Sequence, residues 1–205
     1  MKFLALTLLA AAGLAGCSIF KSNAPVEQVY VLRPSAPVAA TSTVPGGLAV
    51  PRPAVDPGLE SPRIALVRPG NRMDYYASAR WGGSLSEVLH SLIGQRLRAS
   101  GAFGVVDTDR GGFGAQYVLN VSVRRFEAEY GADPEGAPTA RVVLECTVAD
   151  RGARRTLGSF DVTTSVPADA NRMGAVVAAL ERAANEAIDQ VIERSTMALA
   201  VAGAR

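Results

Sequence analysis

Three consecutive runs, in residues 117–130, 141–148 and 154–166, constrain what this chain can fold into more than any other feature of its sequence. In the first two runs an apolar side chain recurs at every second position, which puts these side chains on one face of an extended strand. They are Tyr117, Leu119, Val121, Val123, Val142, Leu144, Cys146 and Val148. The turn-forming Asp150-Arg151-Gly152 leads toward the third run. We therefore predict a meander of three antiparallel strands with one buried face.

Two segments with helical periodicity flank the meander. Ser84 and Glu87 have the spacing of a capping box, so we expect a helix to begin after Ser84 and to end at Gly101. A second helix is predicted from about Asn171 to Leu199. The apolar stripes comprise Leu85, Val88, Leu89, Leu92 and Ile93 in the first helix and Met173, Val177, Leu180, Ala184, Ala187 and Val191 in the second. We expect both helices to pack on the sheet face that bears Val121, Val123, Leu144 and Cys146.

Shorter β-rich segments lie outside the meander. Strands are predicted at Glu27–Arg33, Arg63–Arg68, Met73–Ala77 and Phe103–Val106, with the second and third paired across Pro69-Gly70-Asn71. Seven of the 12 prolines lie between Pro34 and Pro62, so residues 35–47 are expected to be a linker or loop. Between Pro45 and Pro51, Leu48–Val50 is a candidate short edge strand, because edges tolerate proline. The fold class that follows is α/β (α+β): a single domain with a mixed β-sheet and two longer helices packed on it.

The N-terminus has the pattern of an export signal. Lys2 provides a positive charge, and the apolar run Phe3–Ala12 is shorter than the roughly 20 residues that cross a bilayer core. The following Leu14-Ala15-Gly16-Cys17 resembles the bacterial lipobox, in which the cysteine is acylated and the chain is cut before it. The alternative is an ordinary secretory signal with a cysteine there by chance.

This resemblance predicts the domain organisation. Residues 1–16 would be a signal peptide, residues 17–26 a lipidated cysteine and tether, and residues 27–205 the domain, with the proline-rich stretch at about 34–62 inside it. Ser18, in place of the aspartate that typically retains lipoproteins in the inner membrane of Gram-negative bacteria, favours the outer membrane. We therefore expect an outer-membrane lipoprotein whose domain faces the periplasm.

The composition excludes one class of partner. Without residues 1–16 the chain loses one lysine and keeps 20 basic and 19 acidic side chains. A nearly neutral domain lacks the basic excess of a nucleic-acid binder, so no nucleic-acid partner is expected. With Cys17 lipidated, Cys146 has no disulfide partner, and on an apolar strand face it is predicted to be an inert buried thiol.

Few residues could carry chemistry. His90 is the only histidine and is predicted to be a solvated helix residue, and no His, Cys, Asp or Glu spacing suggests a metal site. Glu127 and Glu129 share a strand face, as an acid/base pair would, but a solvated strand edge is the favoured interpretation. Asp109–Gly114 lacks the ending of a phosphate-binding loop and is better explained as a tight turn. We predict no catalytic residue, no metal and no cofactor, and hence no enzyme.

Trp81 allows two interpretations. It could anchor a partner, because Trp is favoured at binding hot spots, or it could pack the start of the helix against the sheet. Packing is the favoured prediction.

Several short segments, in this order, resemble the auxiliary lipoproteins of ABC-type transport systems, the paraquat-inducible membrane-integrity lipoprotein family. They are Tyr30-Val31-Leu32, Leu59–Val67 leading into Arg80-Trp81, Leu85–Leu97 with Ser100–Phe103 and Val105-Val106, Tyr117–Leu119 and Phe126–Ala128. The resemblance implies an outer-membrane-facing component that docks to an MCE protein and helps move lipids or other hydrophobic molecules between membranes. It implies no catalytic residues. The long proline-rich stretch before Arg63 departs from the family pattern.

Two other functions stay open. One is a different envelope-assembly lipoprotein, such as a plug or chaperone of an outer-membrane protein. The other is a cell-envelope hydrolase, which would need a polar constellation that this sequence does not offer. A homo-oligomer around a tunnel-forming MCE protein is a further hypothesis, because a heterologous interface can close into a ring.

Overall fold

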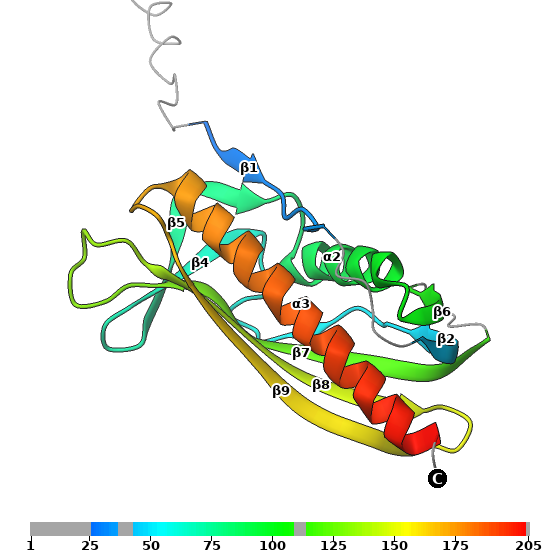
Figure 1. Cartoon of the computed structure of the whole chain (residues 1–205). Helices are drawn as coiled ribbons and strands as arrows, with labels where there is room; N and C mark the ends of the chain where they lie inside the picture. The colour runs from blue at the N-terminus through cyan, green and yellow to red at the C-terminus, as the bar shows by residue number, and fades with distance from the viewer. Residues whose placement is uncertain (1–25, 37–42, 109–113, 204–205) are drawn as a thin grey trace, which may run out of the picture.

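The computed structural model describes residues 26–36, 43–108 and 114–203 and shows one α+β domain (Figure 1). In the described residues a mixed sheet of nine strands carries two helices. The strands are β1 (Gln28–Tyr30), β2 (Val44–Ala49), β3 (Ala54–Val55), β4 (Arg63–Arg68), β5 (Arg72–Trp81), β6 (Phe103–Asp107), β7 (Ala115–Glu129), β8 (Thr139–Asp150) and β9 (Arg155–Pro167). The helices are α2 (Leu85–Ser100) and α3 (Met173–Gly203). The predicted fold class is confirmed.

The predicted meander is present as β7, β8 and β9, which pair antiparallel in sequence order. Val121 lies opposite Cys146 and Val123 opposite Leu144, and all four side chains are buried. A bulge between Val123 and Arg125 inserts one residue into β7. The inward-facing positions therefore change from odd to even numbers, and Phe126, Ala128 and Tyr130 complete the buried face.

The other edge of β7 pairs with three strands in turn. β2, β3 and β4 each run parallel to it, at Tyr117–Val118, Ser122–Val123 and Ala128–Glu129. The strand expected at Leu48–Val50 is present, since Leu48 and Ala49 lie in β2, but its predicted edge position is wrong, because β2 lies between β7 and β6 and pairs with both. The predicted linker is also too long, since β2 begins at Val44, while residues 37–42 of that linker lie outside the described residues.

The remaining strands extend the sheet beyond β4. β4 and β5 form the predicted hairpin, whose turn places Gly70 and Asn71 at positive φ, and β5 continues to Trp81. β1 pairs parallel with the end of β5, with Tyr30 opposite Trp81. Of the predicted strand at Glu27–Arg33 only Gln28–Tyr30 lies in the sheet, and the chain then crosses toward the helices.

Both helices lie on the same face of the sheet (Figure 1). The predicted start of α2 is confirmed, since the Ser84 N–H donates to Glu87 Oε2 at 3.2 Å and Gly101 ends the helix at φ 66°. Helix α3 covers β7, β8 and β9, whereas α2 packs near β3, β6 and α3. The four meander side chains named above therefore lie mainly under α3, which corrects the expectation that both helices pack on them.

Trp81 is at the centre of the join between the β4–β5 hairpin and the meander. Its indole is 1% exposed and meets the Phe126 ring edge-to-face, with the ring centroids 6.0 Å apart. Aromatic pairs with this geometry contribute beyond their buried area. Trp81 is therefore a core residue, as favoured, and the ring that it meets belongs to the sheet.

Candidate functional site

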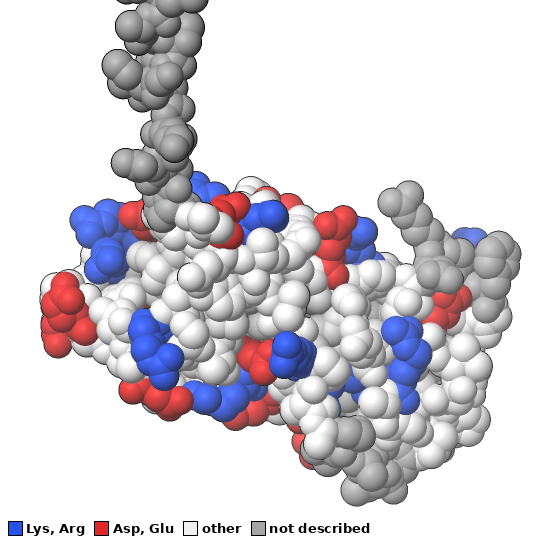
Figure 2. Space-filling model, turned by 90° about the horizontal axis from the view of Figure 1, so that it is seen from above, with Lys and Arg blue, Asp and Glu red and all other residues white. Residues whose placement is uncertain are grey.

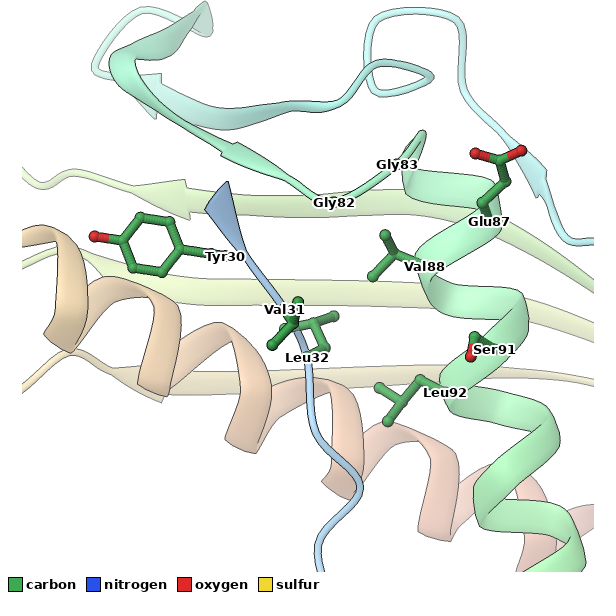
Figure 3. Close-up of a pocket in the computed structure, with 9 residues that line it drawn as sticks. All are labelled: Tyr30, Val31, Leu32, Gly82, Gly83, Glu87, Val88, Ser91 and Leu92. Atoms are coloured by element: carbon green, nitrogen blue, oxygen red, sulfur yellow. The ribbon is translucent and has the colours of Figure 1, made fainter. Parts of the chain in front are cut away.

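The candidate site is an open groove between β1, the residues that follow it, and the N-terminal half of α2 (Figure 3). Its volume is about 290 Å³. One wall comes from the chain just after the proposed tether, and the other comes from the helix that the capping box starts. The lining residues are Tyr30, Val31, Leu32, Gly82, Gly83, Glu87, Val88, Ser91 and Leu92.

The interior of the groove is apolar. Figure 3 shows Val88 and Leu92 of α2 pointing toward Leu32 on the opposite wall. Gly82 lies beside the first wall, where a Cβ atom would be in ordinary van der Waals contact with the Val29 and Val31 side chains, at 3.9 and 4.0 Å. These two valines are 51% and 55% exposed, so the groove continues into an apolar surface on β1. Such a surface beside a groove is suited to contact with another molecule.

The polar groups at the rim already have partners. Glu87 Oε1 accepts from Arg52 at 2.9 Å while Oε2 accepts from the Ser84 N–H. The hydrogen bond from the Arg52 guanidinium holds the pKa of the Glu87 carboxyl below its ordinary value. A carboxylate that stays ionised and caps its own helix is a structural group, which leaves the groove without a poised acid or base.

The residues considered for chemistry from the sequence, His90, Cys146, Glu127 and Glu129, do not line this groove. His90 is half-buried and its Nε2 lies 3.0 Å from the Val50 carbonyl oxygen, so the prediction of a solvated histidine is wrong. The cause is that β2 runs into the sheet interior and brings Val50 against α2. Cys146 is buried and free, as predicted, and burial raises the pKa of its thiol to about 12. Cys17 and residues 109–113 lie outside the described residues.

Glu127 also differs from expectation. It is 2% exposed, and its carboxylate accepts from Arg125 Nε at 2.5 Å and from the Phe126 N–H at 2.7 Å. The favoured interpretation as a solvated strand edge is therefore wrong for Glu127, because the Arg125 side chain and the Phe126 N–H cover its carboxylate. Glu129 pairs with Arg141 at 2.6 Å, and that hydrogen bond lowers the pKa of its carboxyl. Both carboxylates are held by arginines and form an ion-pair network.

No pattern in the sequence indicated the groove. Val88 and Leu92 were recognised as part of a helix stripe, but Val31 and Leu32 carried no signal that they would lie opposite them. In the part of the chain that the structure describes, no group of three His, Cys, Asp or Glu side chains could hold a metal ion. Neither described helix combines the length and apolar character needed to cross a bilayer.

The comparison with protein families is decisive for the class of protein. The model of the ABC-type transport auxiliary lipoprotein component family matches residues 30–192, which includes both walls of the groove. The chain belongs to this family. This match confirms the family resemblance that the short segments indicated. The members of the family are auxiliary lipoprotein components of ABC-type transport. None of the curated proteins matches the chain in sequence.

Solved structures share the fold of this auxiliary lipoprotein. A crystal structure of a Xanthomonas campestris protein has a TM-score of 0.78 at 22% identity and covers 87% of this chain and 100% of its own. An uncharacterised protein has a TM-score of 0.65 at 15% identity, covering 83% and 99%. A hypothetical protein from Chlamydia trachomatis has a TM-score of 0.50 at 11% identity, covering 75% and 97%. At these identities the likeness establishes the fold alone.

Proposed function

We propose that this lipoprotein is anchored in the outer membrane through an acylated Cys17 and serves, in the periplasm, as the docking component of an MCE-type ABC transport system. Such a system would move lipids or other hydrophobic molecules between membranes. The observation that carries the proposal is the family match over residues 30–192. The lipobox pattern at Leu14–Cys17 supplies the anchor.

The size of the groove favours a role in docking to a partner protein over a role in carrying the transported molecule. Sites that enclose a small molecule usually measure about 300–1,000 Å³, and this groove of about 290 Å³ is at the lower limit and open to solvent. It fits one or two inserted side chains better than a whole lipid. A partner that places apolar side chains against Val31 and Leu92 would bury the apolar surface of β1.

The charge distribution supports a protein partner as well. Acidic and basic side chains are interspersed on the face seen in Figure 2, with uncharged areas between them. A mixed surface of this kind lacks the single-sign field that a nucleic-acid partner would need.

The tether limits how far the domain can stand from its anchor. Residues 18–26 fully extended reach at most about 32 Å. In this proposal the partner therefore spans the periplasm, and two membrane-fixed components meet at high effective concentration, so that a weak interface suffices. Several copies arranged as a homo-oligomer around a tunnel-forming partner would fit the same geometry.

Site-specific photo-crosslinking in cells tests this function. A crosslinking residue in place of Val31, in the groove, is expected to capture an MCE protein encoded near this chain. The matched control is Thr163, which is exposed on the opposite face of the sheet, and it is expected to capture much less. Capture of peptidoglycan enzymes alone, or of a β-barrel assembly protein alone, would instead support the hydrolase or envelope-assembly alternative.

A further inference from the structure

The residues that follow β1 are held by the side chains of α3. We call residues 31–36 the strap. The Arg33 N–H donates to Glu181 Oε2 at 2.7 Å, and the Arg33 carbonyl accepts from Asn185 Nδ2 at 2.9 Å. The Ser35 N–H donates to Asn185 Oδ1 at 2.8 Å, so one amide side chain bonds both a donor and an acceptor of the strap backbone.

Helix α2 holds the strap from its other side. Arg96 Nη1 donates to the carbonyl oxygens of Ser35 and Ala36 at 2.7 and 2.9 Å, and Nη2 donates to Asp189 of α3. Arg96 is 1% exposed, and its Nε has no hydrogen-bond partner among the described residues. Glu181, Asn185 and Asp189 are four residues apart and therefore share one face of α3.

The strap and the helix side chains that hold it differ in how far they are buried. Residues 33–36 of the strap are exposed, whereas Arg96 and Asn185 are buried. In the described part of the chain, every hydrogen bond between the strap and Glu181, Asn185 or Arg96 goes to the strap backbone. Since every residue except proline offers the same N–H and C=O groups, these contacts do not depend on the side chains of the strap.

We propose that Arg96, Glu181 and Asn185 form a binding site for extended polypeptide backbone, and that the strap occupies this site in cis. The ligand class is a short extended segment that presents two N–H donors and three carbonyl acceptors at this spacing. Residues 33–36 are held with little burial of their own side chains, and of the strap residues Leu32 packs against the core. Residues 33–36 are therefore a low-stability element that can leave without unfolding the sheet.

The strap follows β1, the strand that fixes the end of the tether. The pairing of β1 with β5 fixes the chain from Gln28, about 11 residues after Cys17, which is at most about 39 Å of extended chain. Release of the strap alone leaves β1 paired with β5 and the chain still fixed from Gln28. Only if β1 also leaves β5 does β2 at Val44 become the next strand that holds the chain, and the limit then rises to about 95 Å. This consequence rests on the proposed lipidation of Cys17. Release would also remove Val31 and Leu32 from the wall of the groove.

Two substitutions at one position test whether the site binds backbone. Amide hydrogen exchange in the complete domain, resolved to single residues, measures how firmly the strap is held. Ser35→Ala keeps the N–H that donates to Asn185, and the exchange rate of the Arg33 amide is expected to stay unchanged. Ser35→Pro removes that N–H, and the Arg33 amide is expected to exchange about tenfold faster. Equal rates in the two variants would overturn the proposal.

A second pair of variants tests the helix side of the contact. Asn185→Ala is expected to speed exchange across residues 31–36 and to leave the amides of β7 and β8 unchanged. Glu186→Ala, an exposed neighbour on the same helix, is expected to match the unmodified chain. If Asn185→Ala unfolds the domain, the Glu181→Ala variant tests the proposal instead, because this substitution removes only the acceptor of the Arg33 N–H. An unchanged Arg33 exchange rate in that variant would contradict the proposal.

None of these measurements involves lipid or an MCE partner, so their failure is distinct from failure of the proposed function.

Discussion

A Cβ atom on Gly158 would lie 2.9 Å from the Cβ atom of Ala198, so β9 and the last turns of α3 approach more closely than two side chains allow. Gly158 pairs with Val148 in β8, which places this contact where the helix crosses the edge strand of the meander. The alanine at position 198 and the glycine at position 158 together set the distance between helix and sheet.

Gly158→Ala is therefore expected to destabilise the domain. Overpacking of a tight contact typically costs about 1–3 kcal/mol, which outweighs the smaller entropic gain of replacing glycine. Gly131→Ala is the control, because a Cβ atom there meets nothing within 4 Å, and it is expected to be neutral or slightly stabilising. Denaturant midpoints of the two variants measure the difference, and a Gly158→Ala midpoint at or above that of the parent chain would contradict the contact.

Leu144→Ala and Leu92→Ala test the buried face of the sheet and the inner face of α2. Both side chains are buried, at 3% and 1% exposure, and truncation in a core usually costs about 2–5 kcal/mol. Thr163→Ala, on the exposed face of β9, is expected to change stability by less than about 0.5 kcal/mol. The prediction fails if urea unfolding gives the three variants the same midpoint.

Cys146 is expected to be protected and to couple stability to alkaline pH. Burial raises the pKa of its thiol from 9.0 to about 12, so above pH 9 the unfolded chain ionises while the folded chain stays neutral. This contribution is fully present below pH 9 and is lost as the pH rises toward 12. The folded protein should resist a thiol reagent at pH 8, and a Cys146→Ala variant should lose less stability between pH 8 and 10 than the parent. Rapid labelling of the folded protein would show that the thiol is accessible.

Cys17 is predicted to carry the lipid. Mass spectrometry of the mature N-terminus should find an acylated cysteine, and membrane fractions should retain the protein. Cys17→Ser should move the protein out of the membrane fraction, since stable anchoring by acyl chains needs the lipid that this thiol accepts. A Cys17→Ser protein that still partitions wholly with membranes would rule out this anchor.

Local patterns were sufficient to predict the elements whose formation depends on neighbouring residues. The alternation at Tyr117–Val123 and Val142–Val148, the capping box at Ser84 and Glu87, and the turn at Gly70 all appear in the structure where expected. The absence of a basic excess and the family resemblance also came from the sequence, and the family match over residues 30–192 confirms the resemblance.

Tertiary structure alone decided three other features. It placed β2 between β7 and β6, it shifted the inward face of β7 from odd to even positions at the bulge, and it brought the strap against Asn185. Each depends on hydrogen bonds between backbone groups and partners far along the chain, and every residue but proline carries the same backbone groups. Asn185 and Arg33 are 152 positions apart, and nothing in either side chain encodes that meeting. Periodicity determines which face of a segment is buried, but only the assembled fold determines what it is buried against.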